Sequence, residues 1–342
     1  MVEVIKKQQY GPLTYLISTS KLILNTEHNI TNIQVAVGIL KDSDAKYLLG
    51  KRLNSQSWPG WWEFPGGKLE KNEKPAEALK REIFEELGIV VKKYKQWTTR
   101  RVIENNKITT LFFFLVLSWS GKIGGKEGQE LKWVNLKSFN SKKILPPNQI
   151  IHKALKNDLG DIYAITNLQE MQSENFFQIL KNKIDQDLKF LQIREKALSE
   201  KDLITFIKQI KRLLKRTNVK IIINGSIDLA YKYELDGVHL NSIQLYELEN
   251  FPNDLLVGVS CHSKKDLEVA EEKNADYVVL GPVKKTLSHP NGEFMGWNKF
   301  KNLAEKSNLP VYAIGGMKKN DIALSFENGA IGIASQRDFW NF

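Results

Sequence analysis

Residues 67–89 read GKLEKNEKPAEALKREIFEELGI, and this stretch decides the fold of the N-terminal half of the chain. It predicts a helix over 75–87, because Pro75 suits a first helical turn and Gly88 can take the left-handed conformation that ends a helix. One face of this helix is apolar, at Ala76, Leu79, Ile83 and Leu87. A helix of this kind packs its apolar stripe against a core and leaves the rest polar.

The same helix carries three carboxylates on a second stripe. Glu82, Glu85 and Glu86 stand at positions i, i+3 and i+4, roughly a quarter-turn from the apolar stripe. Like charges this close repel, whereas a hard divalent cation prefers oxygen ligands and neutralises both the stripe and a phosphorylated substrate. A metal site is therefore one interpretation. A solvated acidic face is the other, and the string EIFEE taken alone favours it.

The spacing of the whole stretch resembles the Nudix signature G-x5-E-x7-R-E-U-x-E-E-x-G-U, in which U is an aliphatic residue. Every defined position agrees, and chance agreement at seven fixed residues is on the order of 10⁻⁸ per starting position. The chain is therefore identified as a member of the Nudix family, whose fold is an α/β/α sandwich.

This resemblance implies that a metal-activated water attacks phosphorus in a nucleoside diphosphate linked to another group. The implied metal is Mg²⁺, with Mn²⁺ as the second candidate. The implied catalytic residues and metal ligands are Glu82, Glu85 and Glu86. The Gly66 carbonyl is a further implied ligand, and Glu82 is also the implied base for the water. Arg81 and Glu73 are expected to pair and hold the loop against the helix.

Three further segments resemble the MutT branch of the family, the 8-oxo-dGTP diphosphatases. They are WEFPGGK, GKEGQ and the pair Pro146-Pro147, and the similarity runs from about Asn32 to Asn157. It implies that Glu127 in GKEGQ is an additional metal ligand, although a lone loop glutamate more often faces solvent. The residues that match substrate contacts of this branch are Arg52, Phe64 and Lys68.

Selection of an oxidised purine requires a polar group that pairs with its altered edge. In the MutT branch an asparagine shortly after the proline pair does this. The segment here is LPPNQI, one residue shorter than the usual arrangement, so Asn148 is the first candidate and Gln149 the second. Trp58, Trp61 and Trp62 are weaker candidates, because tryptophans beside a Pro-Gly turn usually close the edge of a core.

The expected fold class is α/β, with two domains. The runs QVAVGIL from Gln34 and KYLLGKR from Lys46 predict a pair of strands, and TTLFFFLVLSW and LKWVNL predict two more. We expect one domain over 32–158, after an extension over 1–31 to which we assign no function. From Gly160 onward strand and helix alternate in eight units, which predicts a (βα)₈ TIM barrel over 159–342.

The second half resembles thiamine-phosphate synthase and its relative, the TenI-type thiazole tautomerase. Segments that carry the resemblance include DIYAITN, LQIREK, VGVSCHS and AIGGM. Residues that match the grip on a pyrimidine pyrophosphate are Gln192, Arg194 and Lys196. Residues that match phosphate contacts at the carboxyl ends of late strands are Gly315, Gly316 and Ser335.

Two departures from the synthases bear on catalysis in the barrel. An aspartate is expected after Asn224 and another at the end of a GQED segment, but the chain has Gly225 and Gln244 there. Without these Mg²⁺ carboxylates a pyrophosphate leaving group is poorly stabilised, so the synthase reaction should be badly impaired. His262 suits proton transfer in a tautomerase, and a remnant contact explains it equally well.

Composition narrows the remaining possibilities. The 342 residues suffice for two cores, Cys261 is the only cysteine, and no segment has the pattern of a signal peptide or a membrane span, so we expect a cytoplasmic protein. The net charge is +11, but the basic residues are dispersed. We therefore expect small phosphorylated partners rather than stable binding to nucleic acid or a membrane.

Three functions are compatible with these patterns. The first is hydrolysis of 8-oxo-dGTP and other oxidised purine triphosphates to the monophosphate and pyrophosphate, which prevents mutation during DNA replication, beside a degenerate barrel that holds a thiamine-precursor phosphate. The second is a thiamine-pathway enzyme whose Nudix half hydrolyses a pyrimidine or thiamine pyrophosphate and whose barrel is tautomerase-like. The third is a ligand sensor on an inactive Nudix fold, against which the intact string REIFEE argues.

Overall fold

Two sheets and two helices form the N-terminal domain of the structure, a computed structural model that describes residues 31–341 except 105, 140, 172, 187 and 287–292. The first sheet has the order β4-β1-β6-β5, built from Gly66–Lys68, Thr31–Leu40, Lys107–Ser120 and Val90–Glu104. The second has the order β3-β2-β7, built from Trp62–Glu63, Tyr47–Lys51 and Glu130–Val134. The helices are α1 (Pro75–Leu87) and α2 (Pro146–Lys156), with a 3₁₀ turn at Ser141–Lys143.

The helix α1 begins and ends at the predicted residues. Pro75 is its first residue, and Gly88 follows it with a φ of 70°. Its apolar stripe lies so close to β1 that a Cβ on Gly38 would be 2.8 Å from Ile83 Cδ1. The helix is therefore seated firmly on the sheet, and its acidic stripe faces away from that apolar contact.

The expected pairing of the first two strands is wrong. The strand β1 hydrogen-bonds with β4 and β6, whereas β2 pairs with β3 and β7. Among the described residues, one isolated bridge, between Lys41 and Tyr47, connects β1 with β2. The physical reason is that β1 is apolar on both faces: Ala36 packs toward α1 and Val37 toward the second core. A strand that is covered on both faces lies in the interior of a layered domain. After β1 the chain therefore enters the other sheet, as β2.

Eight parallel strands close the barrel of the C-terminal domain, as predicted. They are β8 to β15, at Ile162–Ile165, Phe190–Ile193, Lys220–Asn224, Gly237–Leu240, Leu256–Cys261, Tyr277–Leu280, Val311–Ile314 and Gly332–Ser335. The helices are α3 (Ser173–Asp185), α4 (Glu200–Leu214), α5 (Ile227–Lys232), α6 (Ser242–Glu247), α7 (Lys264–Glu272), α8 (Gly296–Ala304) and α9 (Asp321–Glu327), followed by a 3₁₀ turn at Asp338–Asn341. Large rings fill the interior, among them Tyr163, Phe190, Tyr277 and Tyr312.

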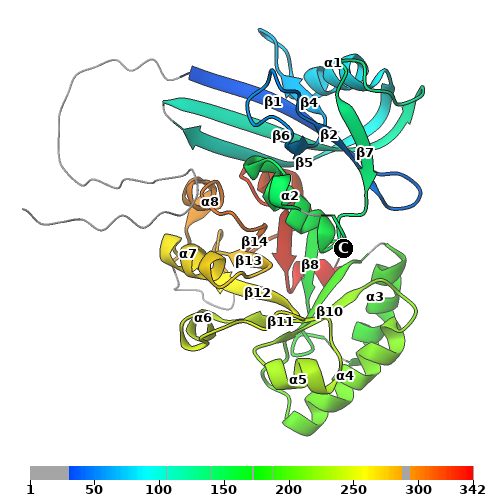
Figure 1. Cartoon of the computed structure of the whole chain (residues 1–342). Coiled ribbons are helices and arrows are strands. Elements are labelled where there is room, and N and C mark those ends of the chain that lie inside the picture. The colour runs from blue at the N-terminus through cyan, green and yellow to red at the C-terminus, as the bar shows by residue number, and fades with distance from the viewer. Residues whose placement is uncertain are drawn as a thin grey trace, which may run out of the picture.

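The N-terminal domain packs against the amino-terminal ends of the barrel strands (Figure 1). The indole nitrogen of Trp97 in β5 donates to the carbonyl of Ile331, just before β15, at 3.2 Å. Arg100 of the same strand donates to the carbonyls of Ala304 and Ser307 at 2.8 and 2.6 Å. Both side chains are buried, so these hydrogen bonds between the domains are shielded from solvent.

The acidic helix and the barrel cavity lie at opposite ends of the molecule. In Figure 1, α1 lies on the side of the N-terminal domain that is remote from the barrel. The barrel cavity is lined at the carboxyl ends of the strands, by residues such as Asn224, His262 and Gln336. The packed barrel core therefore separates the two candidate sites.

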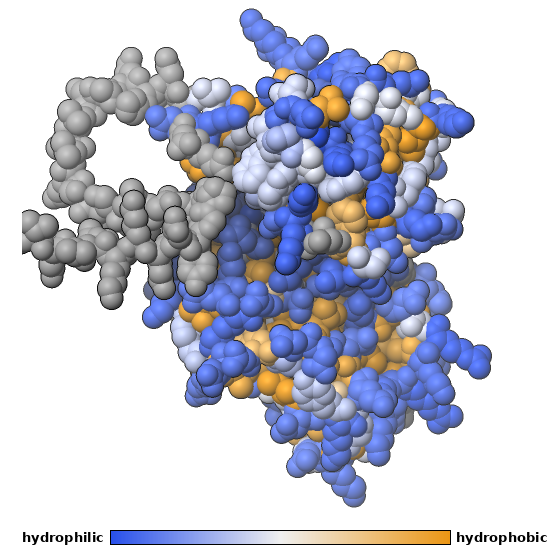
Figure 2. Space-filling model, viewed as in Figure 1, coloured by the Kyte–Doolittle hydropathy of each residue, from blue (hydrophilic) through white to orange (hydrophobic). Residues whose placement is uncertain are grey.

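The surface in Figure 2 is mostly hydrophilic, with smaller apolar areas between the polar ones. Within the described part of the chain, every helix is too short or too polar to cross a membrane. The extension predicted over 1–31 falls, except for its last residue, outside the described residues.

Candidate functional site

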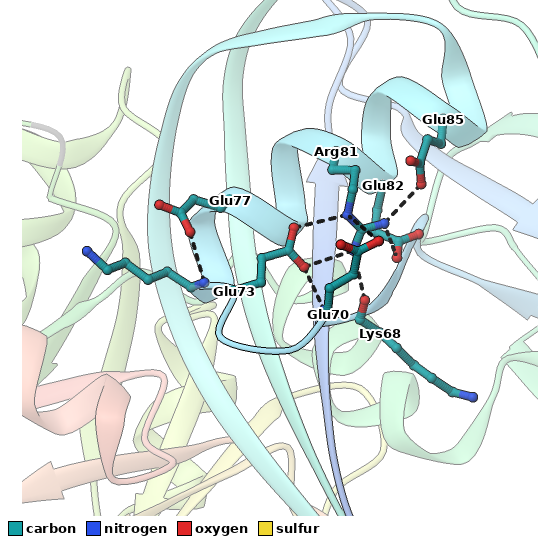
Figure 3. Close-up of polar contacts among 8 residues, drawn as sticks. Lys68, Glu70, Glu73, Glu77, Arg81, Glu82 and Glu85 are labelled. Atoms are coloured by element: carbon teal, nitrogen blue, oxygen red, sulfur yellow. Dashed lines mark hydrogen bonds and ion pairs between the residues drawn. The ribbon is translucent and has the colours of Figure 1, made fainter.

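The side chain of Arg81 connects the glycine-rich loop to the acidic helix (Figure 3). Its Nε and Nη2 donate to the two carboxylate oxygens of Glu73 at 3.0 and 2.9 Å, which confirms the predicted pair. Its Nη1 donates to both Glu82 and Glu85, each at 2.9 Å. Because separate nitrogens serve the loop and the helix, the Glu73 contact can persist when a cation takes Glu82 and Glu85.

The absence of a side chain at Gly67 leaves the space that the carboxylate of Glu82 occupies. A Cβ on Gly67 would lie 2.2 Å from a carboxylate oxygen of Glu82, so any larger residue would displace that carboxylate. Burial raises the pKa of Glu82, and its contact with Arg81 partly offsets the rise. The carboxylate is thus held in a partly desolvated position from which it can accept a proton.

Glu86 is the most buried glutamate of the helix stripe. One of its oxygens accepts a hydrogen bond from the backbone N–H of Gly66 at 2.9 Å. Gly66 has a φ of 144°, and a Cβ there would lie 2.1 Å from the Ala36 carbonyl, so only glycine fits. Burial, together with the nearby charges of Glu127 and Glu63, raises the pKa of Glu86 to about 8.

The GKEGQ loop docks on the carboxyl end of α1. The N–H of Lys126 and the side-chain amide of Gln129 donate to the Glu86 carbonyl at 2.9 and 3.2 Å, and the N–H of Gly124 donates to the Leu87 carbonyl at 3.0 Å. These bonds satisfy helix carbonyls that would otherwise lack partners. They bring Glu127 to the same small pocket as Glu86.

The donor set of this pocket fits a divalent metal in its chemistry. Among the described residues, no three acidic, histidine or cysteine side chains already stand close enough together to enclose an ion. Arg81 bonds both Glu82 and Glu85, and burial raises the pKa of Glu82 and of Glu86, so charging these carboxylates without a cation is unfavourable. An oxygen-liganded cation such as Mg²⁺ would relieve that cost.

The sequence did not single out Glu63, which forms an ion pair with Arg52 in this pocket. Arg52 Nη1 donates to both Glu63 oxygens at 2.7 Å, and its Nε donates to the Ser57 carbonyl at 2.6 Å. Arg52 was predicted to contact substrate, but these polar atoms are engaged within the protein. The available signal was an acidic residue inside the otherwise aromatic string WWEFP.

The other predicted substrate contacts are placed differently. Phe64 is 2% exposed and packs in the core, and the side chain of Lys68 extends away from the glutamates (Figure 3). Asn148 is buried at the start of α2, and its Oδ1 has no hydrogen-bond partner among the described residues, while Gln149 donates to the Ile144 carbonyl at 3.3 Å. Asn148 therefore has an unused acceptor, although it is not among the residues that line the pocket of Glu86.

A cavity of about 690 Å³ opens at the carboxyl end of the barrel. It brings together six of the seven predicted barrel residues, namely Gln192, Arg194, His262, Gly315, Gly316 and Ser335. Lys196 is not among the lining residues. The Nδ1 of His262 lies 2.5 Å from the Gly281 carbonyl, which can only accept. In the neutral ring the Nε2 of His262 is therefore an acceptor.

The lining of this cavity also includes His239, which no sequence motif singled out. His239 Nε2 lies 2.9 Å from Ser260 Oγ, and burial lowers the His239 pKa to about 3. The buried Nδ1 of His239 and Nε2 of Gln192 have no partner within the described protein. Two buried polar groups of the cavity lining are thus able to hydrogen-bond with a ligand.

Known proteins resemble the two halves separately. Residues 32–155 match the NUDIX domain, and residues 162–339 match thiamine monophosphate synthase. An 8-oxo-dGTP diphosphatase of Haemophilus influenzae is 39% identical over 124 residues, which are 36% of this chain and 91% of that protein. A provisionally assigned thiamine-phosphate synthase 2 of Aquifex aeolicus is 35% identical over 179 residues, 52% of this chain and 96% of that protein.

The similarity to a third relative extends beyond the barrel. The thiamine-phosphate synthase of Prochlorococcus marinus is 31% identical over 245 residues, which are 70% of this chain and 67% of that protein. Together with the acidic helix, its docked loop and the closed eight-stranded barrel, these similarities show that the chain belongs to the Nudix hydrolases through residues 32–155 and to the thiamine monophosphate synthase family through residues 162–339.

Proposed function

We propose that the N-terminal domain hydrolyses 8-oxo-dGTP to 8-oxo-dGMP and pyrophosphate in the cytoplasm and thereby keeps an oxidised base out of DNA. The observation that carries the proposal is the Glu82, Glu86 and Glu127 arrangement around the Gly66 turn, within a domain 39% identical to an 8-oxo-dGTP diphosphatase. A bound Mg²⁺ would be held by Glu82, Glu85, Glu86, Glu127 and the Gly66 carbonyl. It would polarise the attacked phosphoryl group and stabilise the departing pyrophosphate.

The protein groups supply the proton transfer and the orientation. The attacking water forms a bond to phosphorus and gives its proton to Glu82, while the bond to the pyrophosphate oxygen breaks. Burial raises the pKa of Glu82, which makes it a stronger base than an exposed carboxylate. Arg81 orients Glu82 and Glu85 by its Nη1 and keeps the loop in place through Glu73.

Base selection is assigned to Asn148. A buried amide whose oxygen lacks a partner can accept a hydrogen bond from the altered edge of the purine, where oxidation turns N7 into an N–H donor. A base without that donor would leave the amide unpaired, and the lost contact costs about 1–3 kcal/mol.

The barrel is assigned a ligand-binding role. Its cavity gathers Gln192, Arg194, Gly315 and Ser335, and we propose that it binds a phosphorylated thiamine precursor without condensing it. This same cavity motivates a second candidate function, in which the Nudix domain hydrolyses a pyrimidine or thiamine pyrophosphate and His262 serves a tautomerase. The acceptor at His262 Nε2 favours that alternative.

A hydrolysis screen of the full chain tests these proposals. The substrates are 8-oxo-dGTP, dGTP and thiamine pyrophosphate, each with Mg²⁺ and with EDTA. We expect kcat/KM for 8-oxo-dGTP to exceed that for dGTP by at least about tenfold, and Asn148→Ala to reduce the ratio. Equal efficiency on the two nucleotides, or preference for thiamine pyrophosphate, would establish the second function instead.

Two sets of variants accompany the screen. Glu82→Gln should keep the fold and lower turnover by orders of magnitude, because it removes the base but preserves the shape of the side chain. Glu85→Gln and Glu86→Gln should mainly raise the Mg²⁺ concentration needed for half-maximal rate. Near-normal turnover of Glu82→Gln at saturating Mg²⁺ would exclude the mechanism.

A further inference from the structure

The two positions at which synthases carry metal-binding aspartates touch each other in this protein. The side-chain amide of Gln244 donates to the carbonyl of Gly225 at 2.7 Å. The Gln244 Oε1 accepts from the N–H of Asn241 at 3.2 Å, in a capping box at the start of α6. Both ends of the Gln244 amide are therefore satisfied by backbone groups.

This arrangement does not fit a metal ion. An amide N–H donor points at the backbone where carboxylates are expected, and Gly225 supplies no side chain at all. Gly225 also has a φ of 76°, a conformation that favours glycine over an aspartate. The backbone conformation at Gly225 is therefore compatible with the hydrogen bond from Gln244.

The remaining charge in the cavity lining is mostly positive. The basic residues that line it are Arg194, Lys285, Lys318 and Arg337, of which Arg337 also pairs with Glu170. In the described lining, Asp338 is the acidic residue. Arg194 is half-buried beside Gln192, and the Gly315 and Gly316 turn lies at the end of β14 within the same wall. Lysines and arginines at these places can match the two negative charges of a phosphate monoester without a metal.

We propose that the barrel binds a phosphate monoester by basic side chains and backbone donors without a metal, and that the Gln244 amide occupies the metal position. This inference rests on the proposed ligand-binding function of the barrel. It narrows the ligand to a monoester, because a departing pyrophosphate needs a bound cation, and in the described lining Asp338 is the one carboxylate that could hold it.

The experiment is calorimetric titration of the full chain with thiamine phosphate, once in EDTA and once in saturating Mg²⁺. This probe contains no phosphoric anhydride, so the Nudix domain cannot hydrolyse it. We expect the two dissociation constants to agree within about twofold. Binding that requires Mg²⁺ would overturn the inference and leave the ligand-binding function standing.

Engineered variants make the test sharper. Gly225→Asp/Gln244→Asp restores both carboxylates; a Cβ on Gly225 has space, with Gln244 Oε1 as the nearest atom it would meet at 3.5 Å, but the φ of 76° there strains the substitution. In EDTA this variant should bind thiamine phosphate at least about tenfold more weakly than in Mg²⁺. The control Gln244→Ala removes the bridge without adding charge and should stay independent of Mg²⁺; a dependence on Mg²⁺ there would contradict the proposal.

A failure of the underlying function is recognisable. If thiamine phosphate and inorganic phosphate bind neither in EDTA nor in Mg²⁺, the ligand-binding function of the barrel is wrong, and this inference is overturned with it. If the double variant does not fold, the comparison of EDTA with Mg²⁺ on the unmodified chain decides the question.

Discussion

Both carboxylate oxygens of Glu63 accept a hydrogen bond from Arg52, each at 2.7 Å, at the edge of the pocket that also contains Glu86 and Glu127. The same guanidinium donates to the carbonyl and the hydroxyl of Ser57. One arginine thus fastens β3 to the loop that follows β2. That loop carries Trp58 and Trp61, whose ring centroids lie 4.7 Å apart.

We expect Glu63→Ala to raise KM for the nucleotide about tenfold and to change kcat much less. Without the carboxylate, Arg52 loses its partner and the tryptophan loop is no longer fixed beside the pocket. Steady-state kinetics on 8-oxo-dGTP measure both constants. The matched control is Glu130→Ala, which breaks the exposed pair at 2.9 Å between Glu130 of β7 and Lys51 of β2 in the same sheet. Equal effects of the two variants on KM would contradict the positioning role of Glu63.

Gly67→Ala should lower kcat by at least about a hundredfold while the fold survives. The added Cβ would lie 2.2 Å from Glu82, and the carboxylate has to move because the helix backbone is fixed by its apolar stripe. Gly124→Ala is the control, since a Cβ there meets nothing within 4 Å. Turnover and circular dichroism of both variants provide the comparison. Full activity in Gly67→Ala would show that Glu82 need not stay where the structure places it.

Arg100→Ala should destabilise the protein by about 2–4 kcal/mol, because buried carbonyls at the end of α8 lose their donors. Burial lowers the pKa of Arg100 to about 10, so its guanidinium remains charged at neutral pH. Urea unfolding of the full chain measures the loss. The neighbouring Arg101 is more exposed and lies 3.8 Å from Glu305, and its alanine variant should cost less than about 1 kcal/mol. Similar losses in both variants would argue against Arg100 as the main polar contact between the domains.

Acidification should destabilise the barrel through His239. The pKa of this buried imidazole is lowered from 6.5 to about 3, so between these values the unfolded chain binds a proton that the folded chain excludes. The His239 contribution to stability is therefore complete above the unfolded pKa and falls, at up to about 1.4 kcal/mol per pH unit, as the pH decreases toward the folded pKa. Unfolding free energies at about pH 7 and about pH 5 should differ more in the unmodified protein than in His239→Gln. The same pH dependence in both proteins would show that His239 is not the group responsible.

The sequence predicts the acidic helix and the barrel well, because both are local patterns. The Nudix spacing sets α1 from Pro75 to its stop at Gly88, and each barrel strand is a short apolar run between polar helices. Contacts between distant segments carry no such signal. Glu63 faces Arg52 because β3 and β2 pair with Gly50 opposite Glu63, a register that single-residue motifs do not encode.

The substrate contacts show a related limit. Phe64 occupies a position that matches a substrate contact. It is nevertheless buried in the core, because transfer of an aromatic ring out of water is favourable. The domain interface is equally hidden: in the sequence, Trp97 and Arg100 look like ordinary residues of a long strand. Their hydrogen-bond partners lie 234 and 204 residues further along the chain.

The hydrophobic interface between the two domains has a genetic consequence. Apolar residues of both halves, such as Val37, Phe113, Phe326 and Ile331, belong to one buried cluster. Cutting the chain between them would expose that cluster to water and invite aggregation of either fragment. Separately expressed halves should therefore fail to complement each other, and a missense allele at Trp97 should weaken both domains together, so that the two halves are inherited and lost as a single character.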